Sequence, residues 1–187
     1  MPQFPHQEDT MTPRRLAVLC SLLLMTALHA LAQAPLVTPQ SPEVSLAPVA
    51  WLVGGTWTSD VRDPQDGSVT HVENRISWAP NHAAIQFVTN FNGKPHYNGF
   101  YAYDAAKGAI RFYYTSDNGQ LTIGTLTPDL DGKTLHQEFD TTEPNGTISH
   151  IRSTIVRDGN DAYRFTVFIE QNGGWKQLFQ TTYKRRA

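Results

Sequence analysis

Two pairs of charged residues have the spacing that acid–base chemistry on a β-strand would need. Glu73 and Arg75 are two residues apart, and His136 and Glu138 repeat that spacing. Side chains two apart on a strand share one face of the sheet. On a buried face, a carboxylate beside an imidazole or guanidinium would have a shifted pKa and could transfer protons. On an outer face, each pair would stabilise the sheet by roughly 0.2–1 kcal/mol.

Metal, thiol and phosphate chemistry have weaker support. The one cysteine, Cys20, lies in an apolar N-terminal run, so no thiol remains for a disulfide or for catalysis in the rest of the chain. With 15 Lys+Arg against 17 Asp+Glu, the net charge of -2 disfavours a nucleic-acid partner. We expect no metal and no cofactor, because the histidines beyond residue 32 lack paired-ligand spacing. These are His71, His82, His96, His136 and His150.

The N-terminus has the order of residues typical of a signal peptide. Arg14 and Arg15 precede the apolar residues 16–28, and Ala30-Leu31-Ala32 places small residues where a signal peptidase reads. We predict that residues 1–32 are a signal peptide, with Met11 as an alternative start, and that the protein is exported to the periplasm or secreted. The apolar run is shorter than the ~20 residues that cross a bilayer, so no membrane span is expected in the mature form. Residues 33–47, rich in proline, are predicted to be a tether before a folded domain at 48–187.

The strongest pattern in the chain is a recurrent pair of Asn or Asp with Gly. From Asn118 onward these pairs are 13 or 14 residues apart, and each of the two earlier gaps of 26 residues holds another turn signal at its midpoint. Asn, Asp and Gly tolerate the positive φ angles of tight hairpins. Nine turns therefore predict ten strands. The pairs are Asp66-Gly67, Asn92-Gly93, Asn118-Gly119, Asp131-Gly132, Asn145-Gly146, Asp158-Gly159 and Asn172-Gly173.

The segments between these turns alternate apolar and polar residues, as in Tyr163, Phe165 and Val167 with Arg164 and Thr166 between them. Consecutive hairpins make an antiparallel meander, and a sheet of this length removes its exposed edges by closing. The sequence therefore predicts an all-β fold: an antiparallel up-and-down closed barrel of about ten strands with a short lead-in helix at residues 49–53. The first strand, with Trp57, should then lie beside the last.

The lead-in followed by Gly55-Thr56-Trp57 resembles the calycin superfamily of lipocalins and fatty-acid-binding proteins. Within it, the chain looks most like bacterial exported barrels of unknown function and nitrobindin-like haem barrels. The resemblance implies that Trp57 closes one barrel end under a basic side chain of the last strand, for which Lys184 and Arg185 are candidates through a cation–π contact. Nitrobindin-like barrels hold haem through a histidine on a late strand, and here no histidine follows His150.

The more apolar face of each strand is taken as the inner face, which places the charged pairs outside. On β-strand alternation Leu121, Ile123, Thr125 and Trp175 also face inward. The facing of the strand around Tyr97, Tyr101 and Tyr103 stays open. Aromatic rings and neutral amides on the inner face suit a mostly apolar ligand with a few polar atoms. The predicted ligand-binding residues are Asn74, Trp78, Phe87, Tyr114, Gln137, Phe165 and Gln177.

These observations predict a monomeric, exported, lipocalin-like barrel that binds a small, largely apolar molecule without transforming it. Two alternatives stay open. One is a small barrel enzyme, an isomerase, cyclase or lyase, with Glu73 or Glu138 as base beside His136 or Arg75. The other is a secreted interaction module whose exposed tyrosines, in residues 97–103, meet a protein partner.

Overall fold

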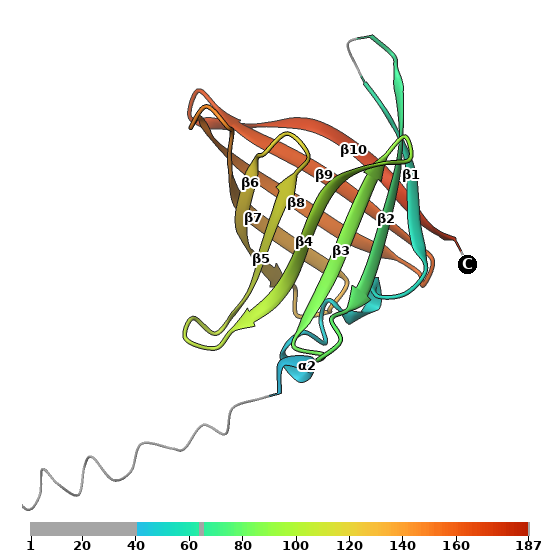
Figure 1. Cartoon of the computed structure of the whole chain (residues 1–187), viewed down its shortest axis with the longest axis vertical. Helices are drawn as coiled ribbons and strands as arrows, with labels where there is room; N and C mark the ends of the chain where they lie inside the picture. The colour runs from blue at the N-terminus through green and yellow to red at the C-terminus, as the bar shows by residue number, and fades with distance from the viewer. Residues whose placement is uncertain (1–40, 64–65, 187) are drawn as a thin grey trace, which may run out of the picture. The chain divides into compact units, whose positions relative to one another are not determined.

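The computed structural model describes residues 41–63 and 66–186, which form ten strands and two short helices (Figure 1). The predicted signal peptide lies outside the described residues. Neither helix in these ranges has the length and apolar character that a membrane crossing requires. The elements are α2 (Pro42–Ser45), the 3-10 helix η1 (Ala50–Leu52), β1 (Thr56–Arg62), β2 (Val69–Trp78), β3 (Ala84–Phe91), β4 (Lys94–Asp104), β5 (Ala109–Ser116), β6 (Leu121–Pro128), β7 (Thr134–Thr142), β8 (Ile148–Asp158), β9 (Ala162–Gln171) and β10 (Gly174–Arg186).

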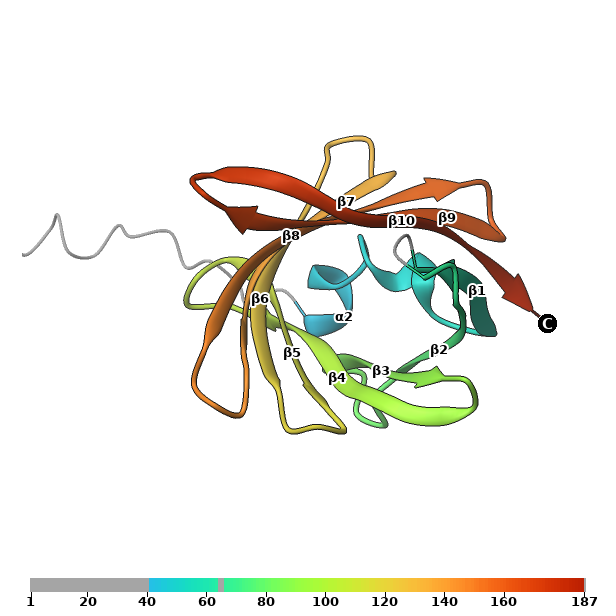
Figure 2. The ribbon, with the colours of Figure 1, turned by 90° about the horizontal axis from the view of Figure 1, so that it is seen from above.

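The strands close into an antiparallel barrel in which each strand pairs with its neighbours in sequence. The circle is completed by β1 and β10, where Trp57 lies opposite Arg185 (Figure 2). Closure leaves no unpaired edge among these strands. The predicted up-and-down barrel of ten strands with a lead-in helix is confirmed.

The turn chemistry accounts for the strand order. At Asn92-Gly93 the φ angles are 51° and 78°, and at Asn172-Gly173 they are 52° and 74°. Two consecutive positive φ angles give the twist that matches a two-residue hairpin, and Asn followed by Gly adopts them at low cost. Local sequence therefore sets each strand beside the next.

One end of the barrel is closed by α2 and η1 (Figures 1 and 2). The Ser41 hydroxyl oxygen accepts a hydrogen bond from the Val44 N–H at 3.3 Å, which caps the start of α2. Leu46 and Val49 are fully buried in the core. The predicted tether at 33–47 therefore ends too late: from residue 42 the chain belongs to the cap, because its apolar side chains pack into the barrel.

The inner face of β6 is the opposite of the predicted one. Leu121 and Ile123 are exposed, whereas Thr122 and Gly124, which alternate with them, are buried. A Cβ atom on Gly124 would lie 2.4 Å from Cζ of Phe112. The ring of Phe112 thus occupies the space that a side chain at position 124 would need, and this packing outweighs the apolar alternation. Thr125, predicted to face inward, shares the outer face with its odd-numbered neighbours.

A second difference lies in β10, where the register shifts between Gln177 and Phe179. This β-bulge reverses the facing of the residues before it. Trp175 and Gln177, both predicted to face inward, are exposed on the outer face. After the bulge, Phe179 and Tyr183 face the interior as predicted.

The open question about β4 is settled by a glycine. A Cβ atom on Gly99 would lie 2.3 Å from the carbonyl oxygen of Tyr113. The inner face therefore contains Gly99 with Tyr97 and Tyr101, and Phe100 is exposed on the outer face. The expectation of exposed tyrosines on this strand is wrong, because Tyr101 is buried and Tyr97 and Tyr103 pack against the core.

Candidate ligand-binding cavity

A cavity of about 520 Å³ lies inside the barrel. Its walls come from the inner faces of nearly all the strands, and Gln120 and Glu143 line it from the β5–β6 and β7–β8 turns. Those turns are at the end opposite α2, so the cavity has a closed end and an open end. Its aromatic lining residues are Phe87, Phe91, Tyr97, Tyr101, Phe112, Tyr114, Phe139, Tyr163, Phe165, Phe179 and Tyr183.

The aromatic side chains form two separate clusters. On the wall made by β3, β4, β5 and β7, the rings of Phe87 and Tyr101 are 5.3 Å apart and those of Tyr97 and Tyr114 are 5.1 Å apart. On the wall made by β1, β9 and β10, Tyr163 stacks on Tyr183 at 4.8 Å. Among the described residues, no ring contact joins one cluster to the other. The rings therefore coat the lumen and leave space between the walls.

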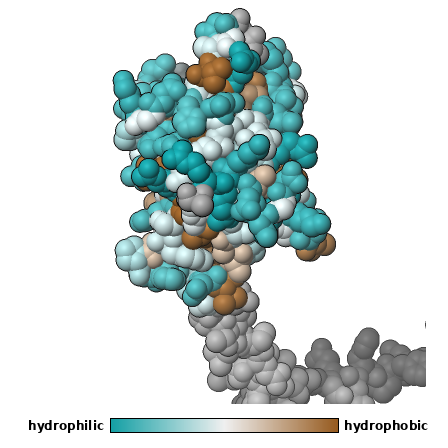
Figure 3. Space-filling model, turned by 90° about the vertical axis from the view of Figure 1, so that its right-hand side faces the viewer, coloured by the Kyte–Doolittle hydropathy of each residue, from teal (hydrophilic) through white to brown (hydrophobic). Residues whose placement is uncertain are grey.

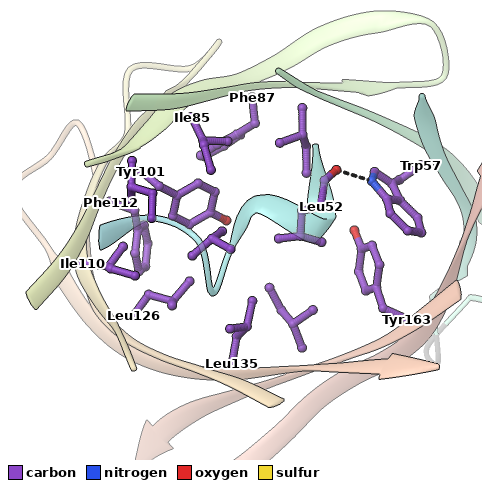
Figure 4. Close-up of a cluster of buried hydrophobic side chains, with 14 of the residues drawn as sticks. Leu52, Trp57, Ile85, Phe87, Tyr101, Ile110, Phe112, Leu126, Leu135 and Tyr163 are labelled. Carbon is purple, nitrogen blue, oxygen red and sulfur yellow. Dashed lines mark hydrogen bonds between the residues drawn. The ribbon is translucent and has the colours of Figure 1, made fainter. Parts of the chain in front are cut away.

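Buried polar groups are placed deep in this space. The Gln137 amide oxygen accepts a hydrogen bond from Ser153 Oγ at 2.6 Å, and its Nε2 donates to the Tyr101 hydroxyl at 3.3 Å. Because both ends of the amide are engaged, its orientation is fixed. The Tyr101 oxygen acts as acceptor in this pair, which leaves its own proton available to a ligand. Figure 4 shows the Tyr101 and Tyr163 hydroxyls among the buried apolar side chains.

Hydroxyl groups continue toward the open end. Thr122 and Thr141 share a hydrogen bond of 2.8 Å, and Thr89 Oγ1 donates to Asn74 Oδ1 at 3.4 Å. The hydroxyls of Tyr97 and Tyr183 have no hydrogen-bond partner among the residues that the structure describes, and Tyr183 is only 8% exposed. Hydroxyl groups that line the cavity can donate a hydrogen bond to a bound molecule or accept one from it. A ligand atom in the cavity could supply that partner.

Burial keeps the inner tyrosines protonated. It raises the pKa of Tyr163 and Tyr183, and it raises the pKa of Tyr101 against the opposing effect of the Gln137 hydrogen bond. For Tyr97, burial and then the nearby charges raise the pKa to about 12. Burial also raises the pKa of Tyr114. The cavity is therefore lined by neutral hydroxyls, because ionised phenolate is disfavoured away from water.

One charged side chain lines the cavity in the described part of the chain, and sequence reasoning missed it. Glu143 lies at the open end, where its carboxylate accepts a hydrogen bond from the Gln120 amide. It belongs to the turn after β7, outside the strand alternation on which the predicted facing depended. Its position between Asp140 and the Asn145-Gly146 turn gave no signal that it would line the interior.

The closed end has a different construction. The Trp57 indole N–H donates to the Leu52 carbonyl at 2.7 Å (Figure 4). The Arg185 guanidinium carbon lies 4.3 Å from the centre of the Trp57 ring, and Arg185 donates to the carbonyls of Trp51, Val53 and Gly54. Of the two predicted basic residues, Arg185 covers Trp57, and Lys184 is exposed.

Five of the seven predicted ligand-binding residues line the cavity. Gln177 lies on the outer face because of the β10 bulge. Trp78 is half-buried near the closed end, where its ring stacks on His82 at 5.5 Å, and it does not line the cavity. Tyr163 and Tyr183 were predicted to face inward, but their hydroxyls were not predicted as binding groups. The five that line the cavity are Asn74, Phe87, Tyr114, Gln137 and Phe165.

The charged pairs that suggested acid–base chemistry lie outside the barrel. Glu138 pairs with Arg152 at 2.8 Å, and His136 pairs with Asp129 at 3.0 Å. Glu73 is 3.9 Å from His71, and Arg75 is exposed. Figure 3 shows one outer face of the protein, which is mainly hydrophilic with isolated apolar side chains. Across the described residues, no group of three or more His, Cys, Asp or Glu side chains could hold a metal ion.

The sequence matches no protein-family model and no curated protein. Among solved structures, the chain is similar to the crystal structure of Rv2717c from M. tuberculosis, with a TM-score of 0.55 and 12% identity. The match covers 76% of this chain and 98% of that one. At this identity the likeness supports the fold alone, and it agrees with the closed antiparallel barrel described above.

Proposed function

We propose that this barrel binds a small, largely apolar molecule carrying a few neutral polar groups, and that it does so without transforming it. One observation carries the proposal: the lumen holds a cavity of about 520 Å³, coated by two separated aromatic clusters. Small-molecule sites typically have ~300–1,000 Å³ and a mostly apolar lining with a few fixed polar groups. The barrel meets each of these criteria.

The polar lining supports a neutral rather than an ionic contact in the interior. Gln137 is held by Ser153 and Tyr101, so its orientation needs no adjustment when a ligand enters. The unpartnered hydroxyl of Tyr183 can donate to or accept from a ligand oxygen or nitrogen. A ligand with one or two such atoms could form hydrogen bonds with these side chains.

The enzyme alternative has less support. Its four residues lie on the outer faces of β2 and β7, away from the cavity, where three of them form exposed or half-buried ion pairs. A general base must lie within hydrogen-bond reach of the proton that it removes. A molecule held in the lumen would be out of reach of all four.

The proposal also includes export, supported by the basic, apolar and small-residue order of residues 1–32. N-terminal sequencing of the secreted or periplasmic protein should begin at Gln33. An intact N-terminus in protein recovered from the cytoplasm would contradict export. The mass of the native particle should be that of one mature chain, since we propose a monomer.

The binding proposal is tested by blocking the cavity from within. Thr89 and Val88 are neighbours on β3, but Thr89 is buried and lines the cavity whereas Val88 is exposed on the outer face. We expect Thr89→Trp to weaken binding of the neutral fluorescent probe N-phenyl-1-naphthylamine, because the new ring takes up part of the lumen. Val88→Trp should bind the probe as the parent does.

Each variant is checked by its circular dichroism and its urea midpoint, so that loss of binding is separated from loss of folding. Native mass spectrometry of protein purified from its own host should also show a retained small molecule. Equal probe binding by the two tryptophan variants, or no binding by the parent, would contradict the proposal.

A further inference from the structure

We propose that the molecule bound in this cavity is an amphipathic amine, with its apolar body in the lumen and its ammonium group beside Glu143 at the open end. This inference rests on the proposed function and deepens it by naming the ligand class. Three observations on the described residues carry it: one charged side chain, Glu143, lines the cavity; no basic side chain lines it; and the interior is neutral.

The carboxylate of Glu143 is held in place where a ligand head group would emerge. The carboxylate accepts a hydrogen bond from Gln120 Nε2. The backbone N–H of Glu143 donates to the Thr147 carbonyl at 2.8 Å. Both Gln120 and Glu143 line the cavity and are half-buried. One carboxylate oxygen is engaged by Gln120, which leaves acceptor capacity for a second donor.

The lining offers nothing to neutralise an acidic ligand. In the described ranges, no Lys, Arg or His lines the cavity. His96, a basic group at this end, stacks on Phe91, and its Nδ1 lies 2.7 Å from a carboxylate oxygen of Asp117, so that its charge when protonated would be balanced by Asp117. A fatty-acid carboxylate at the open end would face the carboxylate of Glu143. Like charges at such a site repel, and opposite charges attract.

The deeper cavity favours the apolar part of the ligand. An ammonium group placed among the inner aromatic rings would lose its hydration without gaining a carboxylate. At the open end it keeps water, pairs with Glu143 and lies close to Tyr97, whose ring face attracts a cation. Burial is the main cause that raises the pKa of Tyr97 to about 12, followed by Tyr114 and then by the charges of Asp117 and Glu143. The head group therefore stays at the open end and the apolar body fills the lumen.

Three probes of equal chain length separate these effects. Decylamine, decanol and decanoate are cationic, neutral and anionic at pH 7, and each is titrated against bound N-phenyl-1-naphthylamine below its micelle concentration. We expect decylamine to bind about fivefold more tightly than decanol, because two charges 4 Å apart in water interact by about 1 kcal/mol. Decanoate should bind more weakly than decanol.

The role of Glu143 is tested with a matched substitution. Glu143→Gln should remove the preference for decylamine over decanol and leave the affinity for decanol unchanged. Glu170→Gln is the control, because it removes the same charge from the outer face of β9 and should keep the preference.

The outcomes distinguish the two proposals. If decanol and the neutral probe fail to bind the parent protein, the proposed function itself fails. If decanol binds but decanoate binds as well as decylamine does, the cavity binds ligands and the inference about the amine is wrong. Retention of the decylamine preference in Glu143→Gln would also overturn it.

Discussion

The two ends of this barrel are built from the same ten strands, yet they differ in how their inward side chains are used. At the closed end, Leu52 and Trp57 are at most 1% exposed, and Arg185 binds three backbone carbonyls. At the open end, the Tyr97 hydroxyl lines the cavity without a hydrogen-bond partner among the described residues, and the rings stand on separate walls. The comparison teaches that one inward face can be core at one end and binding surface at the other.

Alkaline pH should produce the largest effect, because it acts on several inner hydroxyls at once. Burial raises the pKa of Tyr101, Tyr163 and Tyr183 above the ordinary value of 10, and it raises that of Tyr97 to about 12. The folded state therefore holds protons that the unfolded state releases above pH 10. Below pH 10, the contribution of these tyrosines to the unfolding free energy should not change with pH. Above pH 10, the unfolding free energy should fall as the pH rises to 12 and beyond.

This loss can be measured as the urea midpoint between pH 9 and pH 12, together with tyrosinate absorbance. Tyr183→Phe is an informative variant, because the hydroxyl that it removes has no protein partner in the described chain. It should fold at least as well as the parent at pH 7 and lose less stability at alkaline pH. An unchanged slope in this variant would contradict the burial of Tyr183.

Trp57→Ala sharpens the contrast between the ends. Removing a fully buried Trp should cost about 3–5 kcal/mol, because it leaves a cavity under η1 and removes the ring that Arg185 covers. Phe179 is half-buried and lies toward the open end, so Phe179→Ala should lower the unfolding free energy by less than half as much. Urea unfolding measures both. Equal costs would show that the open end is packed as tightly as the closed end.

Arg185→Ala should have an intermediate effect. The substitution removes hydrogen bonds from a charged donor to the Trp51, Val53 and Gly54 carbonyls, and each such bond contributes about 1.5–3 kcal/mol when buried, with less at an exposed site. We expect a loss of about 2 kcal/mol in unfolding free energy. Lys184→Ala, beside it but exposed, should change stability by less than about 0.5 kcal/mol.

Tyr114→Phe should change the unfolding free energy least of these variants. Its main effect should be on the affinity for the ligand in the cavity. Loss of one hydroxyl should weaken a ligand that bonds to it by about 1 kcal/mol, or about fivefold in Kd. Glu73→Gln, on the outer face of β2, should leave affinity unchanged. The ligand recovered from the native host is the right one for this comparison. The reverse ranking would favour a site built on the outer charged pairs.

The strand order and closure were predictable because their causes are local. Asn92-Gly93 and Asn172-Gly173 specify their hairpins by two positive φ angles, and an even number of antiparallel strands brings Trp57 beside the last strand. The cap was partly predictable, since the lead-in at 49–53 was recognised but the contribution of Leu46 was not.

The facing of individual strands depended on causes that are not local. On β6, the apolar Ile123 turns outward because the Phe112 ring fills the space above Gly124. On β10, a single inserted residue at the bulge moves Gln177 outside. The sequence of one strand predicts neither the packing over Gly124 nor the bulge in β10, because each depends on a neighbouring strand. For the same reason, Glu143 enters the lining from a turn.

The central claim is that the lumen is open and takes up a small molecule from the end opposite α2. A crystal structure of the protein grown with N-phenyl-1-naphthylamine tests it most directly. We predict electron density for the probe between Phe87 and Phe165, within reach of Tyr114, with the two aromatic clusters still apart. Density for the probe only on the outer face, or a lumen closed by contact between the clusters, would contradict the account.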